Sequence, residues 1–260
     1  MPDPSAPQAS EWKVVAASVR GSSHEKTGQP CQDAHAWLAL PGPALVAAVA
    51  DGAGSAPLAE VGAELAVRVA VDYVSRHAGA QDWPANDAGW RSLVGAALGK
   101  AREALLIEAA ARGASPSDLA TTLIILVAAR GTVAAAQIGD GATVLGDREG
   151  NLLALTTPRS GEYINETTFL VSPGAVDEAQ VVVWHGDAAH LAAVSDGLQM
   201  LALKMPEGSP HPPFFAGLFQ FAAAANDAGA ARGELEAFLG SPKVLERTDD
   251  DLTLLLATIE

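Results

Sequence analysis

The chain has 260 residues, of which 49% are hydrophobic, 18% charged and 5% aromatic, a composition typical of an ordered globular protein that can bury a sizeable core. Its formal net charge of -15 at pH 7 argues against nucleic acid and anionic membranes as partners, because no basic stripe offsets the repulsion. Cys31 is the only cysteine, which excludes an intramolecular disulfide, and the start MPDPSAPQAS lacks the basic and apolar regions of a signal peptide, so we expect a cytoplasmic location.

The chain arranges its strands and helices in blocks, after an N-terminal tail of residues 1–10 that we expect to be disordered. Apolar runs bounded by Gly and Pro predict the strands. In chain order the predicted strands are Trp12–Val19, Ala34–Leu40, Ala44–Ala50, Leu119–Ala129, Thr132–Ile138, Thr143–Gly146, Leu152–Leu155, Gln180–Trp184, His190–Ser195 and Leu252–Ile259. The second and third are predicted to form a hairpin, and the fourth, fifth and sixth a meander.

Apolar residues at helical spacing predict two long helices between the first and second blocks of strands. One runs from Pro57 to about His77, and the other from about Ala88 to Ala111. Shorter helices are predicted at Leu198–Leu203, Pro213–Ala225 and Glu234–Leu239. Blocks of this kind, without strict βαβ alternation, predict an α+β fold with two stacked antiparallel sheets, in which residues 11–260 form a single domain.

Three apolar runs end in the same dipeptide. ALVAAVA leads into Asp51-Gly52, TVAAAQIG into Asp140-Gly141, and HLAAVS into Asp196-Gly197. Asp-Gly is a favoured turn dipeptide, and for Asp140 a simple hairpin turn is as good an interpretation as a functional loop. A helical pattern rather than a returning strand follows Asp51 and Asp196, and this favours functional loops at those two positions.

Two further acidic stretches stand at the start of strands. Asp249-Asp250-Asp251 leads into LTLLLATI, where a solvated acidic turn is the alternative interpretation, and Asp33 shares a strand face with His35. Carboxylates that converge in a cleft cannot all stay ionised unless cations offset them, and sites of oxygen ligands without sulfur suit magnesium or manganese. A glycine after an aspartate lets the backbone approach an ion, and Gly52 is the best candidate for a carbonyl ligand.

These pieces, in this order, resemble the metal-dependent protein phosphatases of the 2C type (PPM family), and bacterial members in particular, over nearly the whole chain. The matching pieces are QDAHAW, VAAVADGAGS, TTLIILVA, AAAQIGDGATVL, LAAVSDGL and DDDLTLLLA. The resemblance implies a four-layer α-β-β-α sandwich with two central antiparallel β-sheets flanked by helix pairs. It also implies a binuclear metal centre in a cleft at one end of the sandwich.

The resemblance further implies a set of ligands for two Mn²⁺ or Mg²⁺ ions. Asp51 would bridge both ions, and Gly52 would offer its carbonyl. Asp196 and Asp250 would hold one ion, and Asp33 would support the other, partly through water. Many relatives bind a third, weaker ion at the position of Asp140, so this residue is a candidate for a third site.

Two positions depart from the family pattern. Relatives often have an arginine for the substrate phosphate where this chain has Gly28, and Lys26 and His24 are the nearest substitutes. Eukaryotic relatives often have a histidine that protonates the leaving group where this chain has Ala53, so the proton would come from water or from His24. An exposed loop histidine is nevertheless the simpler interpretation of His24.

The predicted activity is hydrolysis of phosphoserine or phosphothreonine in a partner protein, by a metal-bound water held by Asp51 and Asp196. We expect a signalling role opposite a cognate Ser/Thr kinase. Two alternatives stay open: a non-catalytic module that binds a phosphoprotein or kinase, suggested by Gly28 and Ala53, and a hydrolase of small phosphorylated metabolites. The segment Ser160–Ser172 would shape substrate access, and it lacks the family's usual sequence.

Overall fold

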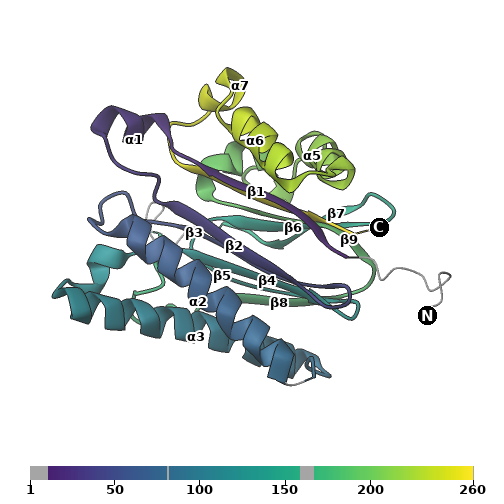
Figure 1. Ribbon diagram of the computed structural model, residues 1–260, viewed down its shortest axis with the longest axis horizontal. Coiled ribbons are helices and arrows are strands. Elements are labelled where there is room, and N and C mark those ends of the chain that lie inside the picture. Colours follow the sequence, from purple (N-terminus) through teal and green to yellow (C-terminus); the bar gives the residue numbers. More distant parts are fainter. Residues whose placement is uncertain (1–10, 81, 159–166, 260) are drawn as a thin grey trace.

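The structure, a computed structural model, describes residues 11–80, 82–158 and 167–259, and its centre is a pair of stacked sheets (Figure 1). All strand pairs within the two large sheets are antiparallel. The first sheet has the spatial order β2 (Asp33–Leu40), β3 (Ala44–Asp51), β4 (Leu123–Ala129), β5 (Thr132–Ile138) and β8 (Gln180–His185). The second has the order β1 (Lys13–Val19), β12 (Leu252–Thr258), β9 (Ala188–Val194), β6 (Ala142–Asp147) and β7 (Leu152–Thr156).

Helix pairs cover the outer faces of both sheets (Figure 1). The first sheet is covered by α2 (Ala59–Ala80) and α3 (Asp87–Arg112), and the second by α5 (Pro212–Ala224) and α6 (Ala228–Leu239). This arrangement confirms the predicted four-layer α+β sandwich. The shorter elements are α1 (Ser22–Thr27), α4 (Gln199–Ala202), α7 (Pro242–Leu245), the 3₁₀ turns η1 (Pro116–Leu119) and η2 (Asp196–Leu198), and the pair β10 (Leu203–Lys204) and β11 (Ser209–Pro210).

The hydrophobic core lies in three layers, one between the sheets and one beneath each helix pair. Every residue of β4 is buried, because one face of this strand packs on the other sheet and the opposite face packs under α2 and α3. Burial on both faces explains why this strand reads as the continuous apolar run LIILVAA. Beneath α2 and α3, small residues such as Ala63, Ala66, Ala97 and Ala101 are fully buried and permit close helix packing.

The boundaries of several elements differ from the sequence-based expectation. The strand expected from Leu119 begins only at Leu123, because Pro116 starts a 3₁₀ turn whose first backbone amide, at Ser115, donates to Asp118 (2.9 Å). The last large helix starts at Ala228, six residues before the predicted Glu234, because the Asp227 carboxylate accepts hydrogen bonds from two backbone amides of its first turn.

The predicted meander is wrong at its third strand. Strands β4 and β5 pair as expected, but β6 lies in the other sheet, next to β9. The chain crosses between sheets at Gly139, whose φ of 107° is accessible mainly to glycine, followed by Asp140-Gly141. The simple hairpin turn considered for Asp140 is therefore wrong.

Two predictions fall partly or wholly outside the described residues. The N-terminal tail, residues 1–10, lies outside the described residues. Residues 160–166, which belong to the segment expected to shape substrate access, also lie outside them. Over residues 11–80, 82–158 and 167–259, no helix combines the length and apolar character that a membrane span requires.

Candidate metal centre

The five candidate aspartates lie at strand ends. Asp33 is the first residue of β2 and Asp51 the last of β3, Asp140 stands between β5 and β6, Asp196 follows β9, and Asp250 precedes β12. These strand ends lie toward the end of the sandwich that carries α1, and the start of β1 and the end of β12 lie toward the opposite end (Figure 1). Segments distant in sequence therefore bring their carboxylates to one end of the sandwich.

Asp33 and Asp51 face each other directly across the β2–β3 ladder. Like charges in opposite ladder positions destabilise a sheet unless a counterion lies between them. The backbone of Asp51 is fixed by two threonines: its amide donates to Thr122 Oγ1 (2.9 Å), and its carbonyl accepts from the Thr122 amide (2.8 Å) and from Thr121 Oγ1 (2.9 Å). The Thr-Thr-Leu motif thus holds the end of β3 in place.

Asp51, Asp140 and Asp196 form the closest group, with one carboxylate oxygen from each lying within 4.8 Å of the others. Asp140 is held from two sides, because Thr167 Oγ1 donates to its Oδ2 (2.6 Å) and Gln199 Nε2 donates to its carbonyl oxygen (2.6 Å). The residue expected only as a candidate for a weaker third site therefore belongs to the central carboxylate group.

Asp33 is buried, and a hydroxyl network fixes it. Ser195 Oγ donates to Asp33 Oδ2 (2.7 Å) and itself accepts a hydrogen bond from the Thr253 amide (2.9 Å). Because Ser195 directly precedes Asp196, and Thr253 stands three residues after Asp250, this network connects the segments that carry three of the candidate ligands.

The clustered charges raise the pKa of several carboxyl groups. Burial, and then the charges of Asp251 and Asp196, raise the pKa of Asp33 to about 7, although hydrogen bonds from Ser195 and Thr253 oppose the rise. Burial also raises the pKa of Asp51 well above its ordinary value, and Asp33, Asp196 and Asp250 raise it further. The pKa of Asp196 rises to about 6, through burial and then the charges of Asp140 and Asp250, and burial raises the pKa of Asp250. Without cations, the centre is electrostatically strained.

The residues present fit a site for hard divalent cations. Within the described part of the chain, Asp33 Oδ1, Asp140 Oδ1 and Asp196 Oδ1 are buried and have no hydrogen-bond partner. Buried polar atoms without a partner are costly, and carboxylate oxygens are the ligands that Mg²⁺ and Mn²⁺ prefer. The three clustered side chains, Asp51, Asp140 and Asp196, offer carboxylate oxygens to an ion.

The glycines after the aspartates serve close packing rather than turn formation. None of Gly52, Gly141 and Gly197 has a positive φ. A Cβ at Gly52 would lie 2.8 Å from Ala59 at the start of α2, and a Cβ at Gly197 would overlap the carbonyl of Asp251. The glycines therefore allow neighbouring segments to approach the aspartates closely.

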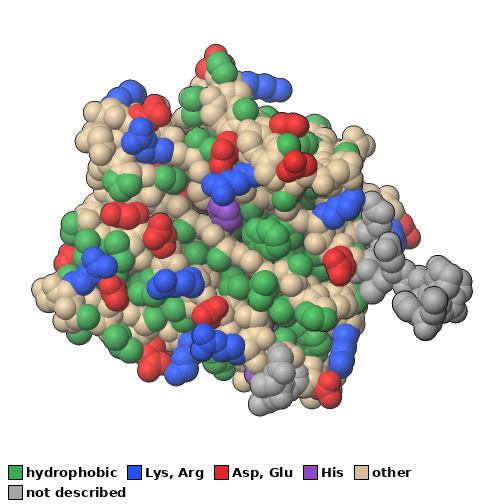
Figure 2. Space-filling view, viewed as in Figure 1, with side chains coloured by type: hydrophobic (Ala, Val, Ile, Leu, Met, Phe, Trp, Pro, Cys, Tyr) green, Lys and Arg blue, Asp and Glu red, His purple; other side chains and the backbone are tan. Residues whose placement is uncertain are grey.

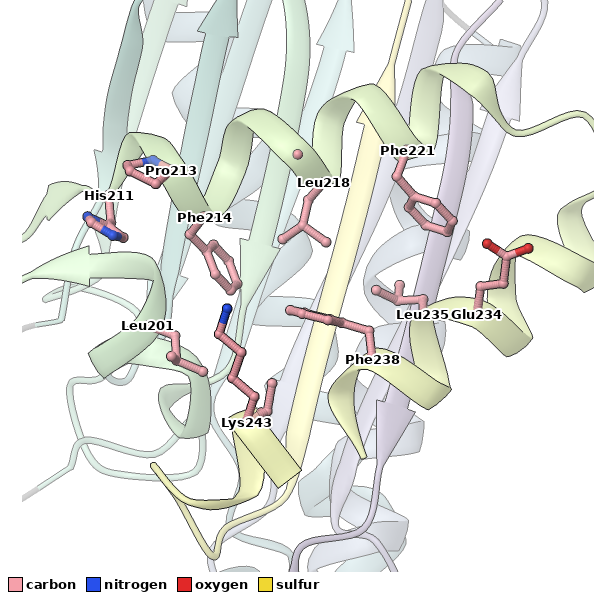
Figure 3. A pocket seen from close by; sticks show the side chains of 12 residues that line it. Leu201, His211, Pro213, Phe214, Leu218, Phe221, Glu234, Leu235, Phe238 and Lys243 are labelled. Carbon is pink, nitrogen blue, oxygen red and sulfur yellow. The ribbon is translucent and has the colours of Figure 1, made fainter. Parts of the chain in front are cut away.

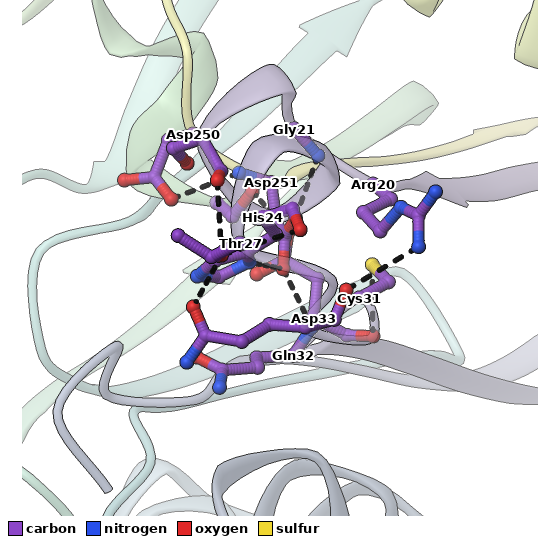
Figure 4. A network of polar contacts seen from close by, with 12 residues as sticks. Arg20, Gly21, His24, Thr27, Cys31, Gln32, Asp33, Asp250 and Asp251 are labelled. Carbon is purple, nitrogen blue, oxygen red and sulfur yellow. Dashed lines mark hydrogen bonds and ion pairs between the residues drawn. The ribbon is translucent and has the colours of Figure 1, made fainter.

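The run Asp249–Asp251 is a solvated acidic turn only in part, because Asp249 and Asp250 are exposed whereas Asp251 is buried. Asp250 is exposed at the end of the sandwich, and its Oδ1 accepts from the Asp251 amide (2.8 Å). Asp251 is 2% exposed, and the Gly21 amide, the His24 imidazole and the Gln32 amide converge on its carboxylate (Figure 4).

His24 is buried, so the exposed loop histidine expected from the sequence is wrong. It lies on α1, a short helix that the sequence did not predict, and its Nδ1 is 2.9 Å from Asp251 Oδ2. Gly28 ends α1 in the left-handed conformation (φ 73°), which explains why no larger residue stands there. Lys26 is exposed on the same helix.

One apolar cavity lies away from the aspartates. It has a volume of about 510 Å³ between α5, α6 and α7, and Phe214, Leu218, Phe238 and Lys243 are among the residues that line it (Figure 3). None of the five candidate aspartates is among its lining residues. On the face shown in Figure 2, Lys and Arg side chains are scattered among acidic ones.

Sequence reasoning missed the residues that hold the aspartates. These are Thr121, Thr122, Thr167, Ser195, Gln199, Asp251 and Thr253. For several of them a signal was present, since a hydroxyl residue directly precedes Asp196 and another stands two residues after Asp251. Small polar residues are common near strand ends, however, and the pattern gains meaning only when the partners are known.

Comparison with known proteins agrees with this geometry. The family described as "Protein phosphatase 2C" matches residues 20–240. Serine/threonine-protein phosphatase 3 of Escherichia coli (strain K12) is 40% identical over 252 residues, which cover 95% of this chain and 98% of that protein.

Among solved structures, the serine/threonine phosphatase Stp1 from Staphylococcus aureus matches with a TM-score of 0.65 at 13% identity, over 100% of both chains. The catalytic domain of the phosphatase PstP, in complex with two manganese ions, matches with a TM-score of 0.62 at 18% identity, over 96% of this chain and 99% of that one. The chain therefore belongs to the protein phosphatase 2C family, the metal-dependent protein serine/threonine phosphatases.

Proposed function

We propose that this chain removes phosphate from phosphoserine or phosphothreonine in a partner protein, with two Mn²⁺ or Mg²⁺ ions at the aspartate centre. The observation that carries the proposal is the approach of Asp51, Asp140 and Asp196 to within 4.8 Å, together with buried carboxylate oxygens that lack partners. The 40% identity to a serine/threonine-protein phosphatase supports the same substrate class.

Each aspartate has a specific role in this proposal. Asp51, at the centre of the group, would hold both ions together with the carbonyl of Gly52. Asp196 and Asp250 would complete one site, and Asp33 would support the other. When bound, the ions make water a nucleophile at neutral pH and offset the charge of the phosphate. The rigid supports of Asp51 and Asp33 hold the ligands in place for both ions.

Three finer points belong to the same proposal. Asp140 takes a third ion, together with Asp196, and Lys26, exposed on α1, contacts the phosphorylated substrate. The domain, residues 11–260, acts in the cytoplasm as the signalling partner of a Ser/Thr kinase. The net charge of -15 disfavours nucleic acid and anionic membranes as partners.

The test compares the purified chain with Asp51→Asn, Asp196→Asn and a control, Asp147→Asn, which changes an aspartate in the β6–β7 turn. We expect Mn²⁺- or Mg²⁺-dependent phosphate release from a phosphoserine peptide, complete loss with chelator, and a loss of at least about 100-fold in the two centre variants. Calorimetry should show uptake of at least two ions by the unchanged chain and by Asp147→Asn.

Three results would contradict the proposal in different ways. Full activity of Asp51→Asn in chelator would show that the centre is not catalytic. Binding of a phosphopeptide without turnover, with uptake of at most one ion, would indicate the non-catalytic module. Turnover of small phosphorylated metabolites, with none of phosphopeptides, would indicate the other alternative and correct the substrate class.

A further inference from the structure

The buried pair His24–Asp251 lies beside the metal centre but outside the set of metal ligands. His24 is 9% exposed and Asp251 2% exposed, and their Nδ1 and Oδ2 atoms are 2.9 Å apart. Short helix α1 carries the histidine, and the segment that brings Asp250 to the centre carries the aspartate. A buried carboxylate bonded to one nitrogen of an imidazole fixes the tautomer and the ring orientation.

Asp251 is itself held rigidly. Its Oδ1 accepts from the Gly21 amide (2.7 Å), and its Oδ2 accepts from the Gln32 amide (2.5 Å) as well as from His24. The backbone of α1 is also tied to this segment, because the amide and the hydroxyl of Ser23 both donate to the Asp249 carbonyl (2.9 and 2.7 Å). Gly21 is required for this docking, since a Cβ there would overlap the backbone of Asp250.

With Nδ1 bonded to Asp251, the free nitrogen of His24 is Nε2, and it faces the loop that follows Asp51. A Cβ placed on the exposed Gly54 would lie 3.9 Å from Nε2. The neighbouring Ala53 cannot direct a side chain into this space, because it is buried against Ala56, Ala59 and Ala120. The imidazole of His24 therefore reaches, from another element, the loop next to the shared ligand of the centre.

Three polar side chains next to the centre are already engaged with its aspartates. Ser195 donates to Asp33, and Thr167 and Gln199 donate to Asp140. In the described ranges, none of the five centre aspartates forms an ion pair with Lys or Arg. Burial raises the pKa of Asp250, and a positive charge on His24 opposes that rise, which places the imidazole within electrostatic reach of the centre.

We propose that His24, positioned by Asp251, protonates the serine or threonine oxygen that leaves the phosphorus. The inference rests on the proposed phosphatase function. In this step the Nε2–H bond of the imidazolium breaks and an O–H bond forms on the leaving oxygen as the P–O bond breaks. His24 becomes neutral and regains its proton from solvent, while the attacking water transfers its oxygen to the phosphate and releases a proton. His24 is the catalytic residue, and Asp251 is the positioning residue.

The basicity of the leaving oxygen provides a test that does not depend on titration curves. A serine alkoxide is a strong base and needs a proton as it leaves, whereas p-nitrophenolate is a weak base and leaves without one. A positioned general acid contributes about 100- to 10,000-fold. His24 should therefore matter for a phosphoserine peptide and matter little for p-nitrophenyl phosphate.

The informative variants keep the local structure. His24→Asn retains an amide that can donate to Asp251 but cannot transfer a proton. Asp251→Asn retains one acceptor oxygen but lacks the second carboxylate oxygen that helps to hold the imidazole in place. Glu25→Ala is the matched control, because this exposed residue on the same helix forms only a 3.8 Å surface ion pair with Arg20. Calorimetric Mn²⁺ titration and thermal unfolding are measured for each variant.

We expect His24→Asn to lower kcat for the phosphoserine peptide by about 100-fold or more, and kcat for p-nitrophenyl phosphate by less than about threefold. Asp251→Asn should show the same split with a smaller loss, and combining the two substitutions should add little to His24→Asn, because Asp251 acts through His24. Glu25→Ala should behave like the unchanged chain, and Mn²⁺ uptake should be the same in all variants.

Equal losses of activity on both substrates in His24→Asn, or no loss on either, would overturn the inference. It would also be overturned if Asp251→Asn lowered the activity of His24→Asn as much as it lowers that of the unchanged chain. If Asp251→Asn unfolds, His24→Asn alone decides, because its ratio of activities on the two substrates does not need the second variant. Failure of the proposed function would look different: the unchanged chain itself would then hydrolyse neither substrate.

Discussion

Asp33 offers a direct measure of the electrostatic cost of the metal centre. Its pKa is raised from 3.8 to about 7 in the folded chain, mainly by burial. Between these values the unfolded chain gives up a proton that the folded chain retains, so the stability of the metal-free protein must fall as the pH rises. Above about pH 7, the loss attributable to Asp33 amounts to about 4 kcal/mol, because each pKa unit corresponds to about 1.4 kcal/mol.

Replacing Asp33 with asparagine should recover this energy in the metal-free protein. The amide oxygen can accept the hydrogen bond from Ser195, and the amide nitrogen takes the place of Oδ1, which has no partner among the residues described. We expect Asp33→Asn to raise the free energy of unfolding by up to about 4 kcal/mol at about pH 8 and by about 1 to 2 kcal/mol at about pH 5.

Urea unfolding, followed by tryptophan fluorescence in chelator at both pH values, measures these differences. Asp82→Asn serves as a control, because its side chain is 91% exposed and makes a surface ion pair with Arg130. With saturating Mn²⁺ the order should reverse, since the unchanged chain binds the ions more tightly and gains more stability from them. The reasoning is refuted if the metal-free protein is equally stable at both pH values, or if Asp33→Asn destabilises it at about pH 8.

Two further predictions concern the surroundings of the centre. Thr167→Val removes the 2.6 Å hydrogen bond to Asp140 Oδ2. This substitution should weaken Mn²⁺ binding at the third site several-fold in calorimetry and leave the two tighter sites unchanged. Equal weakening of all three sites would contradict this prediction. Phe215→Ala removes a fully buried side chain from the layer beneath α5. The free energy of unfolding, measured in urea, should fall by about 3 to 5 kcal/mol, while Mn²⁺ affinity stays unchanged. A fall of less than about 1 kcal/mol would show that neighbouring side chains close the cavity.

The sequence was sufficient for the layers, and it singled out aspartates that the fold brings to one end of the sandwich, because both leave local patterns. Apolar periods indicated the long helices and most strands, and aspartates at strand ends need only the correct strands to be recognised. Sheet membership was beyond this reasoning: β5 and β6 are neighbours in sequence but lie in different sheets. Nothing local in TVAAAQIGDGATVL distinguishes a hairpin from a crossing, since the outcome depends on which distant strands pair.

The environment of His24 was unpredictable for the same physical reason. A six-residue helix with few apolar residues has little intrinsic stability, and α1 exists because Asp249 and Asp251 bond to it from more than 200 positions away in the chain. The sequence shows a polar loop and three acids, both of which are usually solvated. Only the fold shows that one acid of the three is committed to α1 and another faces the centre.

Helix α1 also bears on both departures from the family pattern. The helix ends in a left-handed residue, which favours glycine at position 28 and disfavours a larger side chain such as arginine there. The same helix carries His24 to the loop beyond Asp51, and Ala53 in that loop is buried among Ala56, Ala59 and Ala120. The conformation of Gly28 and the position of His24 thus both follow from the presence of α1. A binding module that had lost catalysis would have no need to bury a histidine against a clamped carboxylate beside intact metal ligands, because burying that pair costs desolvation energy.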